Sequence, residues 1–360
     1  MRDPGLKPLR LLVVMPSWLG DCVMATPALR MLRASLPGCF IGGLVRPGND
    51  ALLAGLDFFD ELHVERASGV MGPKFVAAKV RPRRYDSALL LTNSFSTALT
   101  VRIAGIPRRV GYDRDARGLL LTHRLKAPTR ADASWAPVPA VSYYAHAAQC
   151  LLDPLHPPGL APDTPIPPLP MELATTPEEE ARADAILAAA GVAAGARFAM
   201  LNPGGNNPAK RWPTDRFAAL ARHLHDARRL CVLVNGSPAE AELVAEIALK
   251  SGIGCVQLPR LGITIGALKA LVRRSTIMVT NDTGPRHIAA AFGVPVVSLF
   301  GPTDHRWTTI HAPAGEAVVL ADPSLPPDQL ANDHPDRCAI TQITESRVLD
   351  AVAGFLGPTE

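Results

Sequence analysis

Short apolar runs and helix-like stretches alternate along the first half of this chain. Runs of Val, Leu and Ile predict strands, and a stretch with helical spacing follows the first of them. The predicted strands span Arg10–Met15, Phe40–Val45 and Ala88–Thr92, and the predicted helix spans Cys22–Ala34. Strands that alternate with helices are typical of a parallel sheet with helices on both faces, so we expect an α/β fold.

The second half of the chain repeats this alternation. Its predicted strands span Phe198–Asn202, Cys231–Asn235, Ile277–Thr280 and Pro295–Phe300. Its predicted helices span Asp215–Arg228, Glu240–Lys250, Ile265–Arg273 and Gly284–Phe292. The two halves therefore predict two separate open α/β sheets.

A proline-rich segment separates the two halves. Eight prolines lie within residues 154–170, a density that neither a helix nor a central strand tolerates. A chain of 360 residues is also long enough for two domains. We expect a first domain over residues 1–170, a second over residues 171–340, and a C-terminal helix within residues 341–360.

Composition narrows the class of protein. An apolar share of 48% with 19% charged residues is typical of a globular chain, and only 5% aromatic residues argues against a nucleic-acid surface of stacked rings. The six cysteines are scattered and the ten histidines show no metal-ligand spacing, so we expect reduced thiols and no metal. The apolar run after Arg10 is interrupted at Pro16, too early for an export signal, and no run approaches the roughly 20 residues of a membrane span. We expect a soluble, cytoplasmic protein.

Charge is distributed unevenly. Residues 1–150 hold 20 Lys and Arg against 11 Asp and Glu, a net charge of +9, whereas residues 151–360 hold 17 against 22, a net charge of −5. The positive half is either an ordinary solvated face or a landing site for an anionic partner, either a phosphorylated lipid or a membrane. No motif in the sequence supports nucleic acid as that anionic partner.

Four loops follow the carboxyl ends of predicted strands, where open α/β sheets bind ligands. They span Pro16–Asp21, Asn202–Arg211, Asn235–Ser237 and Asn281–His287. We interpret them as parts of one composite site.

The loop Asn281–His287 lies between an apolar strand and a helix. The N-terminus of such a helix attracts phosphate, and Asp282 and His287 add polar groups suited to a nucleotide. The alternative is an ordinary turn in which Asp282 or Thr283 caps the helix and His287 is exposed.

Two further loops offer chemistry. Asp21 either caps a helix or accepts a proton from an attacking hydroxyl. The glycine-rich segment from Pro203 to Pro213 is either a solvated turn or a loop that approaches phosphates while Lys210 neutralises them, although it is not a Walker A sequence. Asp113-Arg114-Asp115 only superficially resembles a metal–nucleotide motif.

Taken together, the motifs resemble glycosyltransferase family nine, the ADP-heptose:lipopolysaccharide heptosyltransferases, and most of all its heptosyltransferase II branch. The resemblance runs in order from about Arg10 to Val352. The matching segments are Pro16–Asp21, Arg84-Tyr85-Asp86, Asn93-Ser94-Phe95, Ala104–Arg109, Pro208–Pro213, Asn281–Gly284 with His287, and Phe300–Thr303.

The resemblance implies a GT-B architecture, two Rossmann-like domains facing a central cleft, and inverting transfer without a cofactor. It makes Asp21 the catalytic base and Lys210 the contact to the diphosphate of ADP-heptose. The implied donor-binding residues are Gly204, Gly205, Asn206, Lys210, Glu240, Asp282, Thr283, Gly284 and His287, and the implied acceptor-binding residues are Trp18, Asn93, Ser94 and Arg109. Gly205 and Asn206 depart from the small hydroxylated residues of the family. Pro285-Arg286 departs too, and Arg286 faces either phosphate or solvent.

The resemblance also implies partners. The acceptor would be the lipid A–Kdo core of lipopolysaccharide, reached by peripheral contact with the inner face of the cytoplasmic membrane. Two rival functions are a nucleotide-sugar epimerase of the same architecture and a non-catalytic nucleotide-sugar-binding protein. An epimerase would convert its substrate without acceptor, and a sensor would bind ADP-heptose without releasing ADP.

Overall fold

The computed structural model describes residues 9–66, 69–161, 169–326 and 338–357. The chain divides into two compact units. The first comprises Met1–Leu173 with Arg306–Ile310, and the second comprises Ala174–His305 with His311–Glu360.

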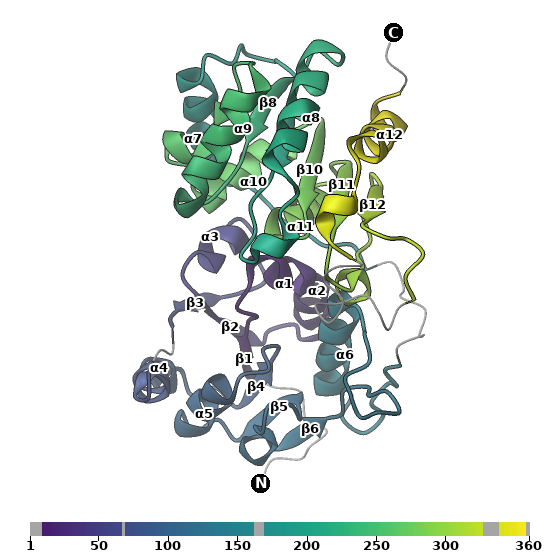
Figure 1. The fold of residues 1–360 in the computed structure, drawn as a ribbon. Coiled ribbons are helices and arrows are strands. Elements are labelled where there is room, and N and C mark those ends of the chain that lie inside the picture. Colours follow the sequence, from purple (N-terminus) through teal and green to yellow (C-terminus); the bar gives the residue numbers. More distant parts are fainter. Residues whose placement is uncertain (1–8, 67–68, 162–168, 327–337, 358–360) are drawn as a thin grey trace. The chain divides into compact units, whose positions relative to one another are not determined.

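The first unit is built on a sheet of six parallel strands in the order β3-β2-β1-β4-β5-β6 (Figure 1). The strands are β1 (Arg10–Val14), β2 (Phe40–Val45), β3 (Glu61–Val64), β4 (Ser87–Leu90), β5 (Arg108–Tyr112) and β6 (His123–Leu125). The helices are α1 (Leu19–Met24), α2 (Thr26–Ser35), α3 (Asn49–Leu53), α4 (Gly72–Val80), α5 (Phe95–Ile103) and α6 (Ala140–Leu152), with short 3-10 helices η1 (Arg81–Arg83) and η2 (Gly118–Leu120).

The second unit carries another six-stranded parallel sheet, in the order β12-β11-β10-β7-β8-β9. The strands are β7 (Phe198–Asn202), β8 (Cys231–Val234), β9 (Val256–Gln257), β10 (Ile277–Asn281), β11 (Val296–Phe300) and β12 (Glu316–Leu320). The helices are α7 (Pro177–Ala189), α8 (Thr214–Asp226), α9 (Ala241–Ser251), α10 (Ile265–Arg274), α11 (Gly284–Ala291) and α12 (Glu345–Leu356). Its 3-10 helices are η3 (Pro208–Lys210), η4 (Pro238–Glu240), η5 (Leu258–Leu261) and η8 (Ile340–Gln342). A further 3-10 helix, η6 (His305–Thr308), begins with a residue of the second unit and continues with residues of the first.

Both sheets have the same Rossmann-like strand order when each is counted from its own first strand. The order reverses where the first strand pairs with the fourth, at β1 and β4 in one unit and at β7 and β10 in the other. Ligands of such sheets bind outside the carboxyl ends of the strands at this reversal. The prediction of two Rossmann-like sheets is confirmed. Ligands are therefore expected at the carboxyl ends of β1, β4, β7 and β10.

Each unit has its own apolar core. The central strands β1, β4, β7, β10 and β11 are buried on both faces, as expected for parallel sheets covered by helices, which explains why they are continuous apolar runs. Helix α12 packs against α8 and β12 within the second unit, where Val348 and Val352 are fully buried. Whether this helix also reaches toward the N-terminal domain stays a prediction.

One predicted helix is wrong, because the structure divides it into two. The stretch predicted as Cys22–Ala34 forms two helices, α1 and α2, which meet at Ala25. Pro27 has no backbone N–H to donate to the carbonyl of Val23, and the hydroxyl of Thr26 donates to that oxygen instead, at 2.7 Å. Among the described residues, no helix has the length and apolarity to cross a bilayer.

Candidate functional site

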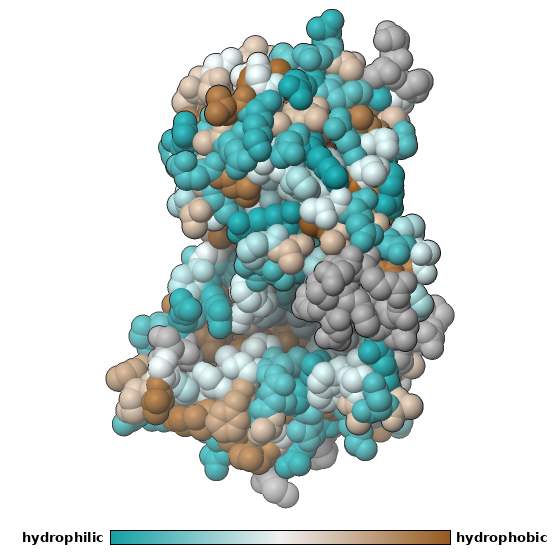
Figure 2. Space-filling view, viewed as in Figure 1, coloured by the Kyte–Doolittle hydropathy of each residue, from teal (hydrophilic) through white to brown (hydrophobic). Residues whose placement is uncertain are grey.

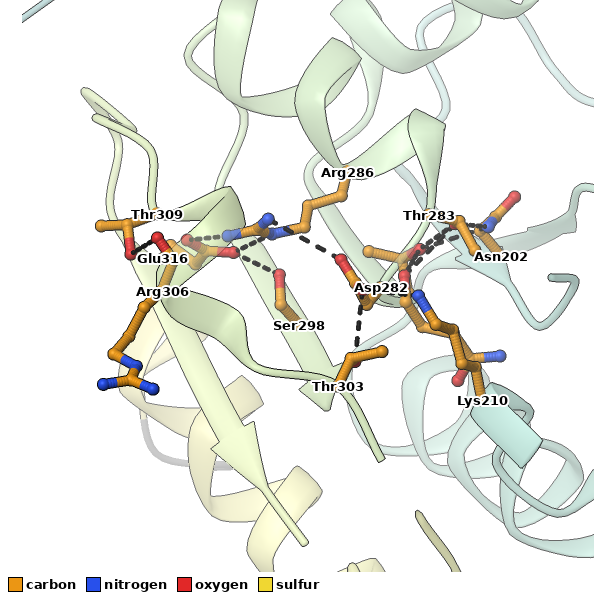
Figure 3. Close-up of polar contacts among 12 residues, drawn as sticks. Asn202, Lys210, Asp282, Thr283, Arg286, Ser298, Thr303, Arg306, Thr309 and Glu316 are labelled. Atoms are coloured by element: carbon orange, nitrogen blue, oxygen red, sulfur yellow. Dashed lines mark hydrogen bonds and ion pairs between the residues drawn. The ribbon is translucent and has the colours of Figure 1, made fainter. Parts of the chain in front are cut away.

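Asn202 joins three strand ends at the carboxyl edge of the second sheet. Its Nδ2 donates to the hydroxyl of Thr283 at 2.8 Å and to that of Thr280 at 3.2 Å. Its Oδ1 accepts from Nδ2 of Asn235 at 2.6 Å. The loops after β7, β8 and β10 are therefore held together by buried amide groups, and Figure 3 shows the contact between Asn202 and Thr283.

The N-terminus of α11 is open to an anion. Thr283 is its N-cap residue, but its side chain accepts from Asn202 and makes no cap hydrogen bond to the helix. No acidic residue lies in the first turn. Since the first N–H groups of a helix carry a partial positive charge and need acceptors, this end suits a phosphate group.

Lys210 and Asp282 form an ion pair beside this helix end. The Lys210 Nζ lies 3.0 Å from Oδ2 of Asp282, and the hydroxyl of Thr303 is 3.4 Å from the same oxygen. Asp282 is one-tenth exposed and Lys210 about one-fifth. The structure therefore brings the predicted diphosphate-binding lysine to the predicted sugar-binding carboxylate.

Arg286 is buried, so the alternative that it faces solvent is wrong. Its Nε and Nη2 donate to the two carboxylate oxygens of Glu316, at 2.6 and 2.9 Å. Its guanidinium also lies over the ring of Phe300 and 4.0 Å from Oδ1 of Asp282. Figure 3 shows Arg286 between the two acidic residues, a position from which it stabilises the orientation of Asp282.

His287 is also buried, which excludes the alternative of an exposed histidine. Burial, and then the charge of Arg286, hold the pKa of His287 well below its ordinary value, so its imidazole is neutral. Its Nδ1 is buried without a hydrogen-bond partner. A neutral imidazole with one unsatisfied nitrogen is suited to hydrogen bonding with a ligand hydroxyl.

The glycine-rich loop is tied to the loop after β8 by Glu240. Its Oε1 accepts from the backbone N–H of Gly205 at 2.8 Å, and its Oε2 accepts from the N–H and hydroxyl of Ser237 at 2.8 and 2.9 Å. Burial alone would raise the pKa of Glu240, but the backbone hydrogen bonds from Ser237 and Gly205 outweigh it and lower the pKa. Asn206 of this loop is exposed.

In the first unit, Asp21 lies in the first turn of α1, after the end of β1. The buried hydroxyl of Tyr144, on α6, donates to Oδ1 of Asp21 at 2.8 Å. Burial, and then the charge of Asp21, raise the pKa of Tyr144 well above its ordinary value, so Tyr144 stays a donor. Asn49 Nδ2 lies 3.3 Å from the carbonyl oxygen of Pro16 and so braces the loop that carries Asp21.

Two of the four predicted acceptor residues, Asn93 and Arg109, make hydrogen bonds within the first unit. The Oδ1 of Asn93 accepts from the fully buried guanidinium of Arg117 at 2.9 Å and from Tyr143 Oη at 3.2 Å. Burial lowers the pKa of Arg117 to about 10. The guanidinium of Arg109 donates to the carbonyls of Leu120 and Ile106, at 2.7 and 2.6 Å.

The other two predicted acceptor residues are Ser94, which caps α5, and Trp18, which is exposed. Ser94 lines a cavity of 120 Å³ at the carboxyl edge of the first sheet. Besides apolar strand ends and Val76 of α4, the cavity is lined by Ser17, Arg46, Glu65, Ser94, Ser96, Thr97 and Thr100. Hydroxyl groups with one cation and one anion are suited to a polar, hydroxylated ligand such as a sugar.

The model of Glycosyltransferase family 9 (heptosyltransferase) matches residues 76–329, which include parts of both units. The chain belongs to glycosyltransferase family 9. It is 29% identical over 323 residues to the lipopolysaccharide heptosyltransferase 2 of Escherichia coli (strain K12), covering 83% of this chain and 85% of that protein. It is 29% identical over 316 residues to the lipooligosaccharide heptosyltransferase 2 of Haemophilus influenzae (strain ATCC 51907 / DSM 11121 / KW20 / Rd), with the same coverage.

Solved structures agree with this assignment. The E. coli ADP-heptose lps heptosyltransferase II superposes with a TM-score of 0.76 at 26% identity, over 96% of this chain and 98% of that chain. The prediction of a glycosyltransferase with two Rossmann-like domains of the GT-B type is therefore confirmed, and the central cleft between the domains stays a prediction.

Several site residues of this family 9 glycosyltransferase could not be singled out from the sequence. Asn202 and Asn235 begin two of the predicted site loops, but their role in joining the strand ends was not predicted. Arg46 and Glu65, which line the cavity, also follow strand ends. Tyr144 and Glu316 lie far along the chain from the residues they contact, and no local pattern marks them.

Lowering the pH is expected to lower the free energy of unfolding, because His287 is neutral in the folded protein. The unfolded chain takes up a proton near the ordinary histidine pKa of 6.5, whereas the folded site does not, so the unfolded state is favoured as the pH falls below that value. The loss is at most about 1.4 kcal/mol per pH unit. Thermal midpoints at about pH 7.5 and about pH 5.5 should differ less in His287→Gln than in the native protein. The control His225→Gln, at an exposed position on α8, should retain the native difference, and an unchanged difference in His287→Gln would contradict this account.

Two adjacent glycines are expected to respond differently to alanine. A Cβ at Gly204 would lie 2.4 Å from Oε1 of Glu240, a carboxylate fixed by three hydrogen bonds, whereas a Cβ at Gly205 would meet Thr283 at an ordinary 3.5 Å. Gly204→Ala should lower the free energy of unfolding by about 1–3 kcal/mol, and Gly205→Ala by less than about 1 kcal/mol. Urea denaturation measures both, and equal losses would show that Glu240 moves away freely.

Proposed function

We propose that this family 9 enzyme transfers a heptose from ADP-heptose to the inner core of lipopolysaccharide, as a heptosyltransferase II-like enzyme with inversion at the anomeric carbon. The names of its relatives support this substrate pair, since the solved E. coli structure is an ADP-heptose lps heptosyltransferase II. The observation that carries the proposal is the cation Lys210 beside the uncapped N-terminus of α11.

The donor would bind at the carboxyl edge of the second sheet. The diphosphate would be bound by Lys210 and by the backbone N–H of Gly284, while Gly204 and Gly205 stay predicted contacts, since the N–H of Gly205 donates to Glu240 here. Asp282, Thr283 and neutral His287 would then receive hydroxyl groups of the nucleotide sugar. Asn206 and Glu240 stay predicted donor contacts, with the ribose as the expected partner of Glu240.

The acceptor would bind at the first unit. Its sugar would enter the hydroxyl-lined cavity at Ser94, with Trp18, Asn93 and Arg109 as predicted contacts. A negatively charged Asp21, held by Tyr144, would take the proton of the acceptor hydroxyl.

The transfer itself needs no covalent intermediate. The acceptor oxygen forms a bond to the anomeric carbon as the bond from that carbon to the β-phosphate oxygen breaks, and the electron pair leaves with ADP. Lys210 and the α11 N-terminus stabilise the negative charge that develops on the diphosphate. The proposal requires both units to act on the same pair of substrates.

The partner and location follow from the same proposal. The lipid A–Kdo core is phosphorylated and carboxylated, and the net charge of +9 over residues 1–150 suits such an acceptor. We therefore place the enzyme in the cytoplasm, in peripheral contact with the inner face of the cytoplasmic membrane.

An assay of ADP release tests the proposed reaction. The protein is incubated with a panel of nucleotide sugars, each with and without a truncated lipopolysaccharide core. ADP should be released from ADP-heptose at a rate that depends on the core acceptor. Conversion of the nucleotide sugar without acceptor would indicate an epimerase instead, and tight binding without ADP release would indicate a sensor.

A further inference from the structure

Large apolar side chains gather on the surface of the first unit where α4 and α5 begin. Val70 is 96% exposed, Phe75 is 65%, Met71 is 48% and Phe95 is 44%. The helices α4 and α5 pack against each other, so these side chains lie on neighbouring elements. Figure 2 shows apolar residues gathered in this part of the surface, at the lower left.

Helix α4 is apolar on two faces. Its buried face places Val76, Ala77 and Val80 in the core of the first unit. Its opposite face exposes Phe75, with Met71 one turn earlier, although nothing in the core requires them there. Exposed apolar side chains of this size, gathered on two neighbouring helices, mark a surface for binding rather than for solvation.

Positive charge is concentrated in the same stretch of the chain. Residues 66–112 contain nine Lys or Arg against a single acidic residue, Asp86, and two of the nine, Lys79 and Arg83, are paired with Glu65 and Glu61. Helices α4 and α5 contain no Asp or Glu, and Lys74 and Arg102 on them are exposed. Aromatic and aliphatic side chains flanked by cations are the pattern of a surface that inserts at the headgroup level of an anionic bilayer.

The same two helices line the hydroxyl-rich cavity. Val76 of α4 and Ser96 and Thr97 of α5 contribute to its wall. Phe75 and Phe95, each next in sequence to a lining residue, are exposed outside it. The exposed apolar surface and the cavity therefore share one helix pair.

We propose that Val70, Met71, Lys74, Phe75 and Phe95, here called the α4–α5 surface, dock on an anionic lipid bilayer. Docking brings the cavity to the membrane surface, where the sugar of a lipid-linked acceptor is presented. The identity of that acceptor rests on the proposed function, but the docking itself does not.

Co-sedimentation with vesicles tests the docking without any nucleotide sugar. The native protein should bind vesicles of phosphatidylethanolamine and phosphatidylglycerol, and should bind phosphatidylcholine vesicles more weakly. The double variant Met71→Ser and Phe75→Ser should bind about tenfold or more weakly, because it lacks the two apolar side chains that would leave water for the bilayer. Lys74→Glu should weaken binding to the anionic vesicles, and added salt should reduce that effect.

Matched substitutions on the second unit serve as controls. Leu249, 84% exposed on α9, is changed to Ser, and the exposed Arg222 on α8 is changed to Glu. Both should bind vesicles like the native protein. On a short, water-soluble core oligosaccharide, the Met71→Ser and Phe75→Ser double variant should release ADP at the native rate. On the same acceptor carried in vesicles, it should be slower.

Several results would overturn the proposal. Native binding of anionic vesicles by the double variant would do so, as would an absence of vesicle binding by the native protein. Sedimentation showing a dimer that the double variant dissociates would assign the α4–α5 surface to a second copy of this chain. Vesicle binding without ADP release under any condition would contradict the proposed function and leave the docking intact.

Discussion

Replacing Asp21 with Asn should lower the rate of heptose transfer by about 10²- to 10⁴-fold, the contribution expected of a positioned general base. The amide keeps the shape of the side chain, and its oxygen can still accept the hydrogen bond from Tyr144 that fixes Asp21 at 2.8 Å. What it loses is the ability to take the proton of the acceptor hydroxyl. ADP binding, measured by calorimetry, should stay close to native, because the proposed donor residues lie in the other unit.

Tyr144→Phe is the companion variant. It removes the hydrogen bond to Asp21 while keeping the carboxylate, so it should lower the rate by less than Asp21→Asn does. Full activity in Asp21→Asn would remove Asp21 from the mechanism, whatever the result for Tyr144→Phe.

Replacing Lys210 with Met should lower the transfer rate by about 10²- to 10³-fold, since removing one group that stabilises developing negative charge typically has this effect. The substitution should also weaken ADP binding, because the cation 3.0 Å from Asp282 is then absent and that carboxylate faces the diphosphate uncompensated. Lys210→Arg keeps the charge and should retain more activity. Steady-state kinetics with ADP-heptose and a core acceptor measure both variants.

Lys250→Met is the matched control for Lys210. Lys250 also forms ion pairs in the second unit, with Glu246 at 2.7 Å and Asp215 at 3.2 Å, but at an exposed position on α9. Exposed pairs of this kind contribute about 0–1 kcal/mol, so neither transfer nor ADP binding should change. Equal losses in Lys250→Met and Lys210→Met would mean that general charge, and not the position of Lys210, is responsible.

The central strands could be predicted from the sequence because each is an apolar run that the structure buries on both faces. The prediction Phe198–Asn202 coincides with β7, and Phe40–Val45 coincides with β2. The edge strands β3 and β6 were missed, since they are short, only partly buried, and contain polar residues such as His63 and Arg124. The break between α1 and α2 was predictable, because Pro27 lies inside the predicted helix Cys22–Ala34 and removes a backbone hydrogen bond there.

The position of the candidate site was more predictable than its contacts. The loops after β7, β8 and β10 could be grouped because their strands are parallel and end at one edge of a sheet. The partners within the site could not be predicted, because they depend on which elements pack together. Tyr144 is 123 residues from Asp21, and Glu316 is 30 residues from Arg286, so only the folded chain brings each pair together.

The central claim is that this chain transfers one heptosyl group with inversion, and the most direct measurement is an analysis of the acceptor after reaction. A truncated lipopolysaccharide core is incubated with ADP-heptose and the purified protein, and mass spectrometry and NMR then determine the product. The account predicts the mass increase of a single heptose and a new glycosidic bond whose anomeric configuration is opposite to that of the donor. An unmodified acceptor, or a bond that retains the donor configuration, would contradict it.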